Sequence, residues 1–422
     1  MRGNPPGRGC GGSRLNGEFA DQFGAHWWLA VATVTRHVGD IDVAEDAVQD
    51  ACEAALAQWP AEGMPANPRA WLISVARHKA LDRLRRDSRR VEKETAAVRE
   101  ASEPDPPAGW PSSTDDELAL VFLCCHPALD PAAQIALTLR SVCGLSTAEI
   151  AAAFLLPEPT MAQRILRAKR KISQAGIPLR VPPACDLPTR LAGVLRVVYL
   201  VFTEGHKATT GPALVRGELC DQAVRLARAL ARLMPDEPEV TGLLALLLLT
   251  DARRKARVGP AGELVLLEDQ DRRLWDRAVI AEGEALIEHA LRSGRPGPYQ
   301  LHAAIAACHA GARSAKDTDW PQIAALYGEL IRYEPTPVVD ANRAVAVAMA
   351  EGPAAGLVIL DAAGAHPGMS RWPQLHIARG EMLRRLGRHA EAVGAYRRAL
   401  ELEPQAAQRA FIADRIRQLG GA

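Results

Sequence analysis

The sequence has few aromatic residues, no long apolar run and almost no net charge. Of its 422 residues, 5% are aromatic, 48% are hydrophobic and 24% are charged, and the formal net charge is +1 at pH 7. Many Ala and Leu residues with so few aromatics favour helices, and the length suggests about three domains. The near-zero total charge does not identify a partner, because charge is segregated along the sequence.

Signals for export or membrane insertion are also missing. The most apolar window, Val240–Thr250, is too short to span a bilayer and is soon followed by three basic residues. Residues 1–17 are rich in Gly, Pro and Arg and lack the apolar core of a secretory signal, so we expect a disordered tail. These absences predict a cytoplasmic protein that does not bind a membrane.

The cysteine pattern argues against a metal site. The chain has eight cysteines, without a CxxC pair or zinc-finger spacing. Cys124, Cys125 and His126 form the one close cluster, but adjacent residues point to different helix faces and no second pair lies nearby. We expect buried, reduced thiols and neither metal nor cofactor. No nucleophile–base pair or phosphate loop is visible, so the sequence does not predict an enzyme.

Positive charge gathers on one expected helix, from Pro68 to about Arg90. Asn67 is placed to cap it, and the apolar positions 72, 76, 80 and 84 form one stripe. The segment has eight Lys or Arg residues against two acids. A helix with one buried side and one cationic side suits nucleic-acid binding. An ordinary solvated charged helix is the alternative.

An acidic stripe precedes this helix. Asp42 followed by Glu45 is a capping signature for a helix that runs to about Trp59. Polar residues then recur at i, i+3, i+4 and i+7, namely Asp46, Gln49, Asp50 and Glu53. An acidic face would not bind DNA, so we expect it to dock on a basic protein surface. The alternative is again a solvated face.

A Pro-rich acidic linker separates the basic helix from a second helical unit. Residues 92–117 contain eight acids against Lys93 and Arg99 and show no pattern that would form a core. The linker could also fold back on the neighbouring basic surfaces when DNA is absent.

The second unit reads as a helix-turn-helix. Asp130-Pro131 opens a helix to about Val142, Gly144 breaks it, and residues 146–149 form a capping box for the next helix. A basic helix follows from about Pro159 to Ala175. In such a motif the last helix enters a major groove, although many helical hairpins share the pattern.

These segments, in this order, resemble the extracytoplasmic-function (ECF) group of bacterial RNA polymerase sigma factors. DVAEDAVQDA is similar to the helix that binds core polymerase, and AWLISVARHKALDRLRR to the helix that recognises and opens the −10 element. GLSTAEIAAAFLLPEPTMAQRILRAKRKI is similar to the helix-turn-helix that reads the −35 element. The resemblance implies an all-α fold with a region 2 helical bundle and a region 4 helix-turn-helix, and as partners core RNA polymerase and promoter DNA.

The resemblance also assigns residues to the three interfaces. Core polymerase would be bound by Asp46, Gln49, Asp50 and Glu53. The −10 element would be contacted by the helix that carries Trp71, Arg77, His78, Lys79, Arg83, Arg85 and Arg86, with Trp71 packing within that unit. The −35 element would be contacted by Thr160, Gln163, Arg164, Arg167, Lys169, Arg170 and Lys171. Of these residues, Arg83, Arg85, Arg86, Lys169, Arg170 and Lys171 would bind phosphates, which position a protein without specifying a sequence.

Two positions depart from the family pattern. His78 stands where many relatives have an Asn beside the flipped −10 base, and an imidazole cannot make the paired contacts of an amide. Ala162 stands where relatives often have Lys or Arg, so one DNA contact is lost.

After a Pro-rich boundary at residues 182–188, the rest of the chain reads as further helices. We expect helices over 190–202, 218–234, 240–255 and 271–292. In the last hundred residues, Gly380, Ala392, Tyr396, Ala399 and Pro404 are spaced as in a tetratricopeptide repeat. Residues 323–335 resemble the second helix of another repeat, and residues 342–360 a degenerate one. This tail resembles the C-terminal extension of the ECF subgroup commonly called ECF42.

Charged clusters in this half are interpreted as structural. Residues 204–206, 236–239 and 268–271, together with Arg253, Arg254 and Arg257, are expected to form ion pairs and helix caps. Ligand or partner contacts are the first alternative, and catalysis is the second. His302, Cys308 and His309 lie on one Ala-rich helix, where packing is the simpler interpretation than metal binding.

The sequence therefore predicts a sigma factor with a fused regulatory array. The expected parts are a tail (1–17), region 2 (18–91), an acidic linker (92–116), region 4 (117–178), a helical extension (184–296) and repeats (297–422). The array is expected to regulate, through a protein or small-molecule ligand. Two rivals are a helix-turn-helix regulator with a repeat sensor that does not deliver polymerase, and a repeat-based adaptor with a decayed sigma half.

Overall fold

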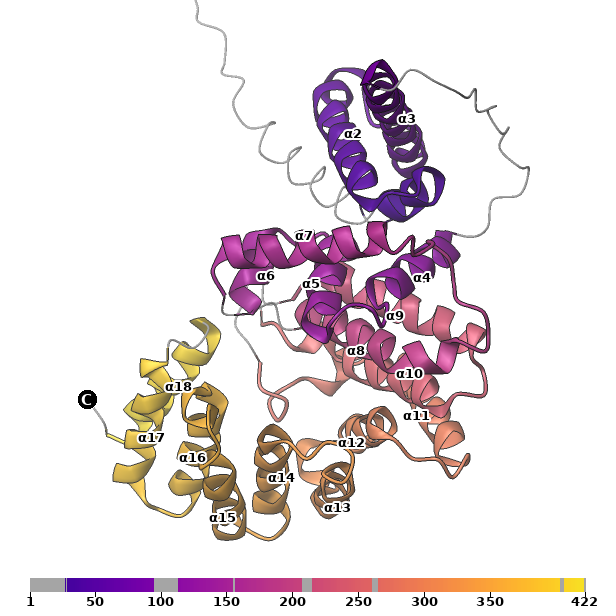
Figure 1. Cartoon of the computed structure of the whole chain (residues 1–422). Coiled ribbons are helices and arrows are strands. Elements are labelled where there is room, and N and C mark those ends of the chain that lie inside the picture. The colour runs from indigo at the N-terminus through magenta and orange to yellow at the C-terminus, as the bar shows by residue number, and fades with distance from the viewer. Residues whose placement is uncertain are drawn as a thin grey trace, which may run out of the picture. The chain divides into compact units, whose positions relative to one another are not determined.

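The computed structural model describes residue 27 and residues 29–94, 113–154, 156–206, 215–259, 265–402 and 406–420. These residues are helical and contain no β-sheet (Figure 1), which confirms the all-α class. The chain divides into two compact units: the first holds the described residues before 207 together with 216–229, and the second holds 215 and 230 onward. The expected tail and most of the acidic linker lie outside the described residues.

The first unit begins with a helical segment over residues 29–38, followed by a pair of packed helices, α2 (Ile41–Glu62) and α3 (Pro68–Glu94). Leu72, Ala76 and Ala80 of α3 are buried, as the apolar stripe predicted, and Val48 and Trp59 of α2 are buried as well. Asn67 caps α3 by accepting from Ala70 N at 3.0 Å. The cap of α2 differs from the prediction: Asp40, not Asp42, accepts from the amides of residues 42 and 43. Asp42 is thus left free for a contact described below.

Four short helices follow in the same unit: α4 (Ser113–Cys124), α5 (Pro131–Ser141), α6 (Thr147–Ala153) and α7 (Glu158–Gln174). Asp130 caps α5, and Gly144 ends its turn with a φ of 66°. The predicted capping box is present, because Ser146 N donates to Glu149 Oε2 at 2.7 Å and Glu149 N donates to Ser146 Oγ at 3.2 Å. The helix-turn-helix therefore forms as its local sequence predicts.

Two longer helices complete the first unit, α8 (Leu187–His206) and α9 (Gly217–Leu233), of which residues up to 229 belong to it. Gly193 allows α8 to pack closely, since a Cβ there would lie 3.3 Å from Gln134 Oε1 of α5. The buried Gln222 of α9 donates to Val142 O at 3.0 Å. The residues after the helix-turn-helix therefore help to form the same core.

The second unit begins with a fully buried helix, α10 (Pro238–Asp251), which explains the apolar window of the sequence. It packs against α11 (Arg277–Leu291) and α12 (Pro298–Gly311). Short turns η1 (Arg254–Ala256) and η2 (Arg272–Leu274) lie between α10 and α11. The sequence predicted one helix over 271–292, but Asp276 caps α11 and delays its start.

Helical hairpins follow in the second unit (Figure 1). They are formed by α13 (Trp320–Leu330), α14 (Pro337–Ala350), α15 (Pro353–Gly364), α16 (Pro373–Arg385), α17 (His389–Glu401) and α18 (Ala406–Gln418), with turns η3 (Ala315–Asp317) and η4 (Met369–Arg371). Gly380 of α16 lies directly against the buried Tyr396 of α17, where a Cβ would be 2.7 Å from the ring. This close approach of small and large residues is the packing that the repeat spacing predicted.

Burial controls the cysteine chemistry. Burial raises the pKa of Cys125 to about 12 and that of Cys124 well above its usual range. All seven cysteines in the described part of the chain are free thiols. Within the same described residues, no helix is long and apolar enough to cross a membrane.

Candidate nucleic-acid interface

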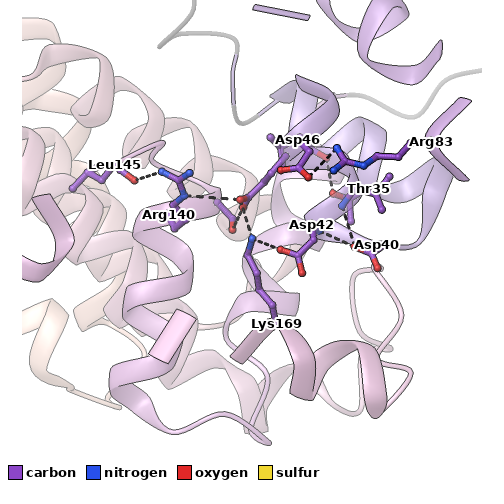
Figure 2. Close-up of polar contacts among 12 residues, drawn as sticks. Thr35, Asp40, Asp42, Asp46, Arg83, Arg140, Leu145 and Lys169 are labelled. Atoms are coloured by element: carbon purple, nitrogen blue, oxygen red, sulfur yellow. Dashed lines mark hydrogen bonds and ion pairs between the residues drawn. The ribbon is translucent and has the colours of Figure 1, made fainter. Parts of the chain in front are cut away.

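The acidic stripe lies on an accessible face of α2. Asp46, Gln49 and Glu53 are exposed and Asp50 is half-buried. Gln49 donates to Glu53 at 3.3 Å, and Asp46 pairs with Arg83 of α3 at 2.9 Å (Figure 2). Because the Asp46 and Arg83 side chains remain 53% and 45% exposed, water screens this ion pair and its contribution is small. The stripe is thus available to a protein partner.

A second acidic pair on α2 is engaged within the first unit. Lys169 of α7 donates to Asp42 at 2.6 Å and to Glu45 at 2.9 Å (Figure 2). Ser141 Oγ donates to the other Glu45 oxygen at 2.6 Å, and Arg140 lies 3.9 Å from Glu45. Burial lowers the pKa of Lys169, but the two carboxylates outweigh it and raise the pKa overall.

This arrangement differs from the expected role of Lys169. The side chain is only 10% exposed, whereas a phosphate contact requires an accessible ammonium group. Asp42 and Glu45 were not predicted as partners of Lys169, because their spacing is that of a helix cap. The sequence did contain a signal for this contact. Glu45 lies among the apolar residues Ala44 and Val48, so its side chain is buried, and a buried acid needs a partner.

Two of the expected −10 residues, Trp71 and Arg83, contact α2, and the others lie along the rest of α3. Trp71 packs edge-on against Trp59 of α2, with ring centroids 5.4 Å apart, so it stiffens the helix pair. The other side chains lie partly or fully exposed along the same helix: Arg77, His78, Lys79, Arg83, Arg85 and Arg86. The structure therefore places cationic groups and one imidazole along an accessible strip.

Five of the seven expected −35 residues converge on one hollow of the helix-turn-helix. Its volume is about 520 Å³. Thr160, Gln163, Arg164, Arg167 and Lys171 line it from α7, opposite Leu129, Asp130 and Ala133. Arg164 also lies over the Phe154 ring, with its Cζ 5.8 Å from the centroid, and Lys171 donates to Ala128 O. Arg170 is exposed outside the hollow.

Several charged residues in the C-terminal half have structural partners. Glu237 caps α10, Glu239 accepts from Tyr299 N at 3.0 Å and Gln300 N at 3.1 Å, and Asp271 pairs with Arg273. His302 lies 3.1 Å from Glu334, and His309 packs edge-on against Trp320. These are the caps, ion pairs and packing contacts that the sequence suggested.

Comparisons with known families match four segments of the chain. Residues 25–90 match sigma-70 region 2, and residues 119–172 match sigma-70 region 4. Residues 190–291 match a family of unknown function, DUF6596, and residues 373–406 match a tetratricopeptide repeat. The first two matches coincide with the helices that carry the acidic and cationic faces.

Individual proteins are also similar to this chain. An uncharacterised protein of Rhizobium meliloti (strain 1021) is 47% identical over 392 residues, which cover 91% of each chain. A probable ECF RNA polymerase sigma factor SigI of Mycobacterium tuberculosis is 34% identical over 166 residues, or 38% of this chain and 56% of the relative. No solved structure matches. The chain therefore contains sigma-70 region 2 and region 4 domains, followed by a domain of unknown function and a tetratricopeptide repeat.

Proposed function

We propose that this protein is an ECF-type sigma factor that binds core RNA polymerase in the cytoplasm and directs promoter-specific initiation. The observation that carries the proposal is the pairing of sigma-70 regions 2 and 4, in that order, with charged faces of opposite sign on their helices. Opening a promoter requires unstacking bases at a few kcal/mol each. Cationic and aromatic side chains can hold the separated strand while a second module anchors the duplex.

The acidic stripe of α2 is the proposed polymerase contact. Exposure of Asp46, Gln49 and Glu53 supports this assignment, and the screened Asp46–Arg83 pair is weak enough to be exchanged for a basic partner surface. The exposed cationic side chains of α3 are proposed to contact the −10 element, and the α7 residues that line the hollow are proposed to contact the −35 element.

The Lys169 contact with Asp42 and Glu45 must open in this function. The names of the two elements place them about 25 base pairs apart, or roughly 85 Å of B-DNA. Helices α2 and α7 are held within hydrogen-bond distance by Lys169, so α3 and α7 cannot reach both elements in this conformation. We infer that polymerase binding separates regions 2 and 4, with the linker spanning them.

The second unit is proposed to regulate the first. The DUF6596 and repeat matches, which lie outside regions 2 and 4, support a regulatory extension, and the ECF42-like subgroup is our proposed classification.

Copurification with core polymerase tests the acidic stripe. The Asp46→Lys/Asp50→Lys double variant should lose at least about tenfold in affinity, since truncating charges at interfaces costs 2–5 kcal/mol. Glu62→Lys is the matched control, because Glu62 is exposed at the end of the same helix and lies outside the stripe.

Unchanged affinity of the double variant would contradict the assigned face. If the unaltered chain did not bind core polymerase at all, the proposal would give way to a DNA-binding regulator that does not deliver polymerase.

A further inference from the structure

Three guanidinium groups surround one buried indole in the second unit. Trp275, between η2 and α11, is 3% exposed. The Cζ atoms of Arg272, Arg253 and Arg277 lie 4.4, 5.8 and 6.0 Å from its ring centroid. A cation over an indole face is favourable, but three like charges around one ring repel one another. The cluster therefore needs compensating negative charge.

The described residues supply that charge only weakly: burial and Arg277 lower the pKa of Arg272, and the carboxylate of Asp317, beyond ion-pair distance, opposes them. Within the described residues, no carboxylate lies at ion-pair distance from Arg253, Arg272 or Arg277. Two arginines next to these in the sequence do have a carboxylate partner. Arg254 donates to both oxygens of Asp251 at 2.8 and 2.7 Å, and Arg273 pairs with Asp271 at 2.8 Å. Around the indole, Arg272 donates to the carbonyl oxygens of His309 and Ala312 at 3.0 and 2.6 Å, which satisfies hydrogen bonds but leaves its charge without a carboxylate partner.

Two hydrogen-bond donors in this arginine–indole cluster lack an acceptor. Arg253 Nε and Trp275 Nε1 are both enclosed and have no hydrogen-bond partner among the described residues. An enclosed donor without an acceptor costs about 1–3 kcal/mol, and more when it is charged. Both groups are donors, so the missing partner is an acceptor.

The electrostatics agree with this geometry. Burial, Arg257 and Arg272 lower the pKa of Arg253 to about 10. Burial, Arg253 and Arg272 lower the pKa of His309 to about 4, so its imidazole is neutral at pH 7. The positive potential therefore persists at physiological pH.

A cavity of about 480 Å³ adjoins the cluster, and Arg272 and His309 form part of its wall. Its other walls are mainly apolar and aromatic, including Trp320, Val345, Met349, Leu360, Trp372 and Phe411. The acids on the wall are Glu268, which is exposed, and Glu381, which binds Arg384 and Tyr396. This volume and this mixture of walls are typical of small-molecule sites.

We propose that the second unit binds a small organic anion, with the apolar body in this cavity and the acidic group at Arg272. Of the three arginines, Arg272 lines the cavity and would pair with a carboxylate or a phosphate ester, while the charges of Arg253 and Arg277 behind it add to the positive potential. The site lies entirely within the second unit, so it stands independently of the proposed polymerase and promoter interfaces.

Thermal unfolding of the full chain tests the site with three probes of equal chain length: octanoate, octyl phosphate and octanol. At least one anion should raise the melting temperature clearly more than octanol does. A larger shift with octanoate assigns a carboxylate ligand, and a larger shift with octyl phosphate assigns a phosphate ester. Octanol matching both anions would overturn the proposal.

Two variants separate binding from structure. Arg253→Met should weaken anion binding by about tenfold or more. Without anion, its melting temperature should equal or exceed that of the unaltered chain, because an uncompensated charge is removed. Arg273→Met, on an 88% exposed side chain, is the matched control and should keep the full anion response. An Arg253→Met chain that binds the anions normally, or that melts earlier without them, would contradict the site.

Discussion

At the scale of single residues, Glu117 of α4 is an acid that the first unit buries without a hydrogen-bond partner for one of its carboxyl oxygens. It is 3% exposed, and its Oε2 atom has no hydrogen-bond partner among the described residues. Burial raises its pKa to about 8, against the opposing charges of Arg225 and Arg69. The folded protein therefore keeps a proton on Glu117 at neutral pH.

This shift predicts a dependence of stability on pH. Between the ordinary carboxyl pKa of 4.5 and about 8, the folded chain binds a proton that the unfolded chain has released, so stability falls as pH rises. The total loss is on the order of 5 kcal/mol at most. Glu117→Gln is neutral at every pH and should be more stable than the unaltered chain at pH 8.5, with little difference at pH 5.

Urea unfolding of the two chains at both pH values measures this effect. Glu62→Gln, at an exposed position of α2, serves as the control and should follow the unaltered chain. A Glu117→Gln chain less stable at pH 8.5 would show that the carboxylate is stabilised when charged.

At the scale of helices, local signals in the sequence predicted much of the structure. The cap at Asn67, the cap at Asp130 and the reciprocal bonds of Ser146 and Glu149 each depend on residues at most three positions apart. The bridge from Lys169 to Glu45 joins residues 124 positions apart, and no local pattern encodes such a partner. The exposed charges of the proposed interfaces were therefore predictable from the sequence, whereas the burial of Lys169 was not.

Breaking that bridge should loosen the contact between α2 and α7. Lys169→Met leaves the carboxylate of Glu45, whose side chain is 8% exposed, without its main partner, which costs about 3 kcal/mol. Adding Glu45→Gln removes the stranded charge and should restore part of the loss. Urea unfolding and hydrogen exchange in α2 and α7 measure both effects.

Arg83→Met is the comparison for an exposed pair and should change stability by less than about 1 kcal/mol. Equal losses in the Lys169 and Arg83 variants would mean that the Lys169 bridge contributes no more than a surface ion pair.

The repeat hairpin offers a test with two glycines. Gly380→Ala places a Cβ 2.7 Å from the Tyr396 ring and should destabilise the second unit by about 1–3 kcal/mol. Gly394→Ala, on α17 of the same hairpin, meets nothing within 4 Å and should stabilise it by up to about 1 kcal/mol. Thermal melts should therefore move in opposite directions, and a shared direction would contradict this packing.

At the scale of the whole molecule, the division into units was harder to predict than the helices. The Pro-rich segment at 182–188 suggested a boundary, yet α8 and most of α9 belong to the first unit. The reason is packing between distant residues, such as Gln222 with Val142 O, which composition does not reveal. Arg253 was noted in the sequence as one of several charges, but its gathering with Arg272 and Arg277 around Trp275 was not predicted, for the same reason.

The division into two compact units determines where a truncated chain should end. A chain of residues 1–234 keeps α8 and α9 and should remain folded, whereas a cut near Arg180 removes packing that the first unit uses. If the second unit regulates, the 1–234 chain should bind core polymerase normally but differ severalfold from the full chain in transcription. Identical transcription by both chains would remove the regulatory role.

The most direct test of the account is in vitro transcription of fragmented genomic DNA from the source organism by core RNA polymerase, with and without this protein. The account predicts new start sites that share two upstream elements at constant spacing, and their loss in the Asp46→Lys/Asp50→Lys variant. Start sites identical to those of core enzyme alone would contradict it.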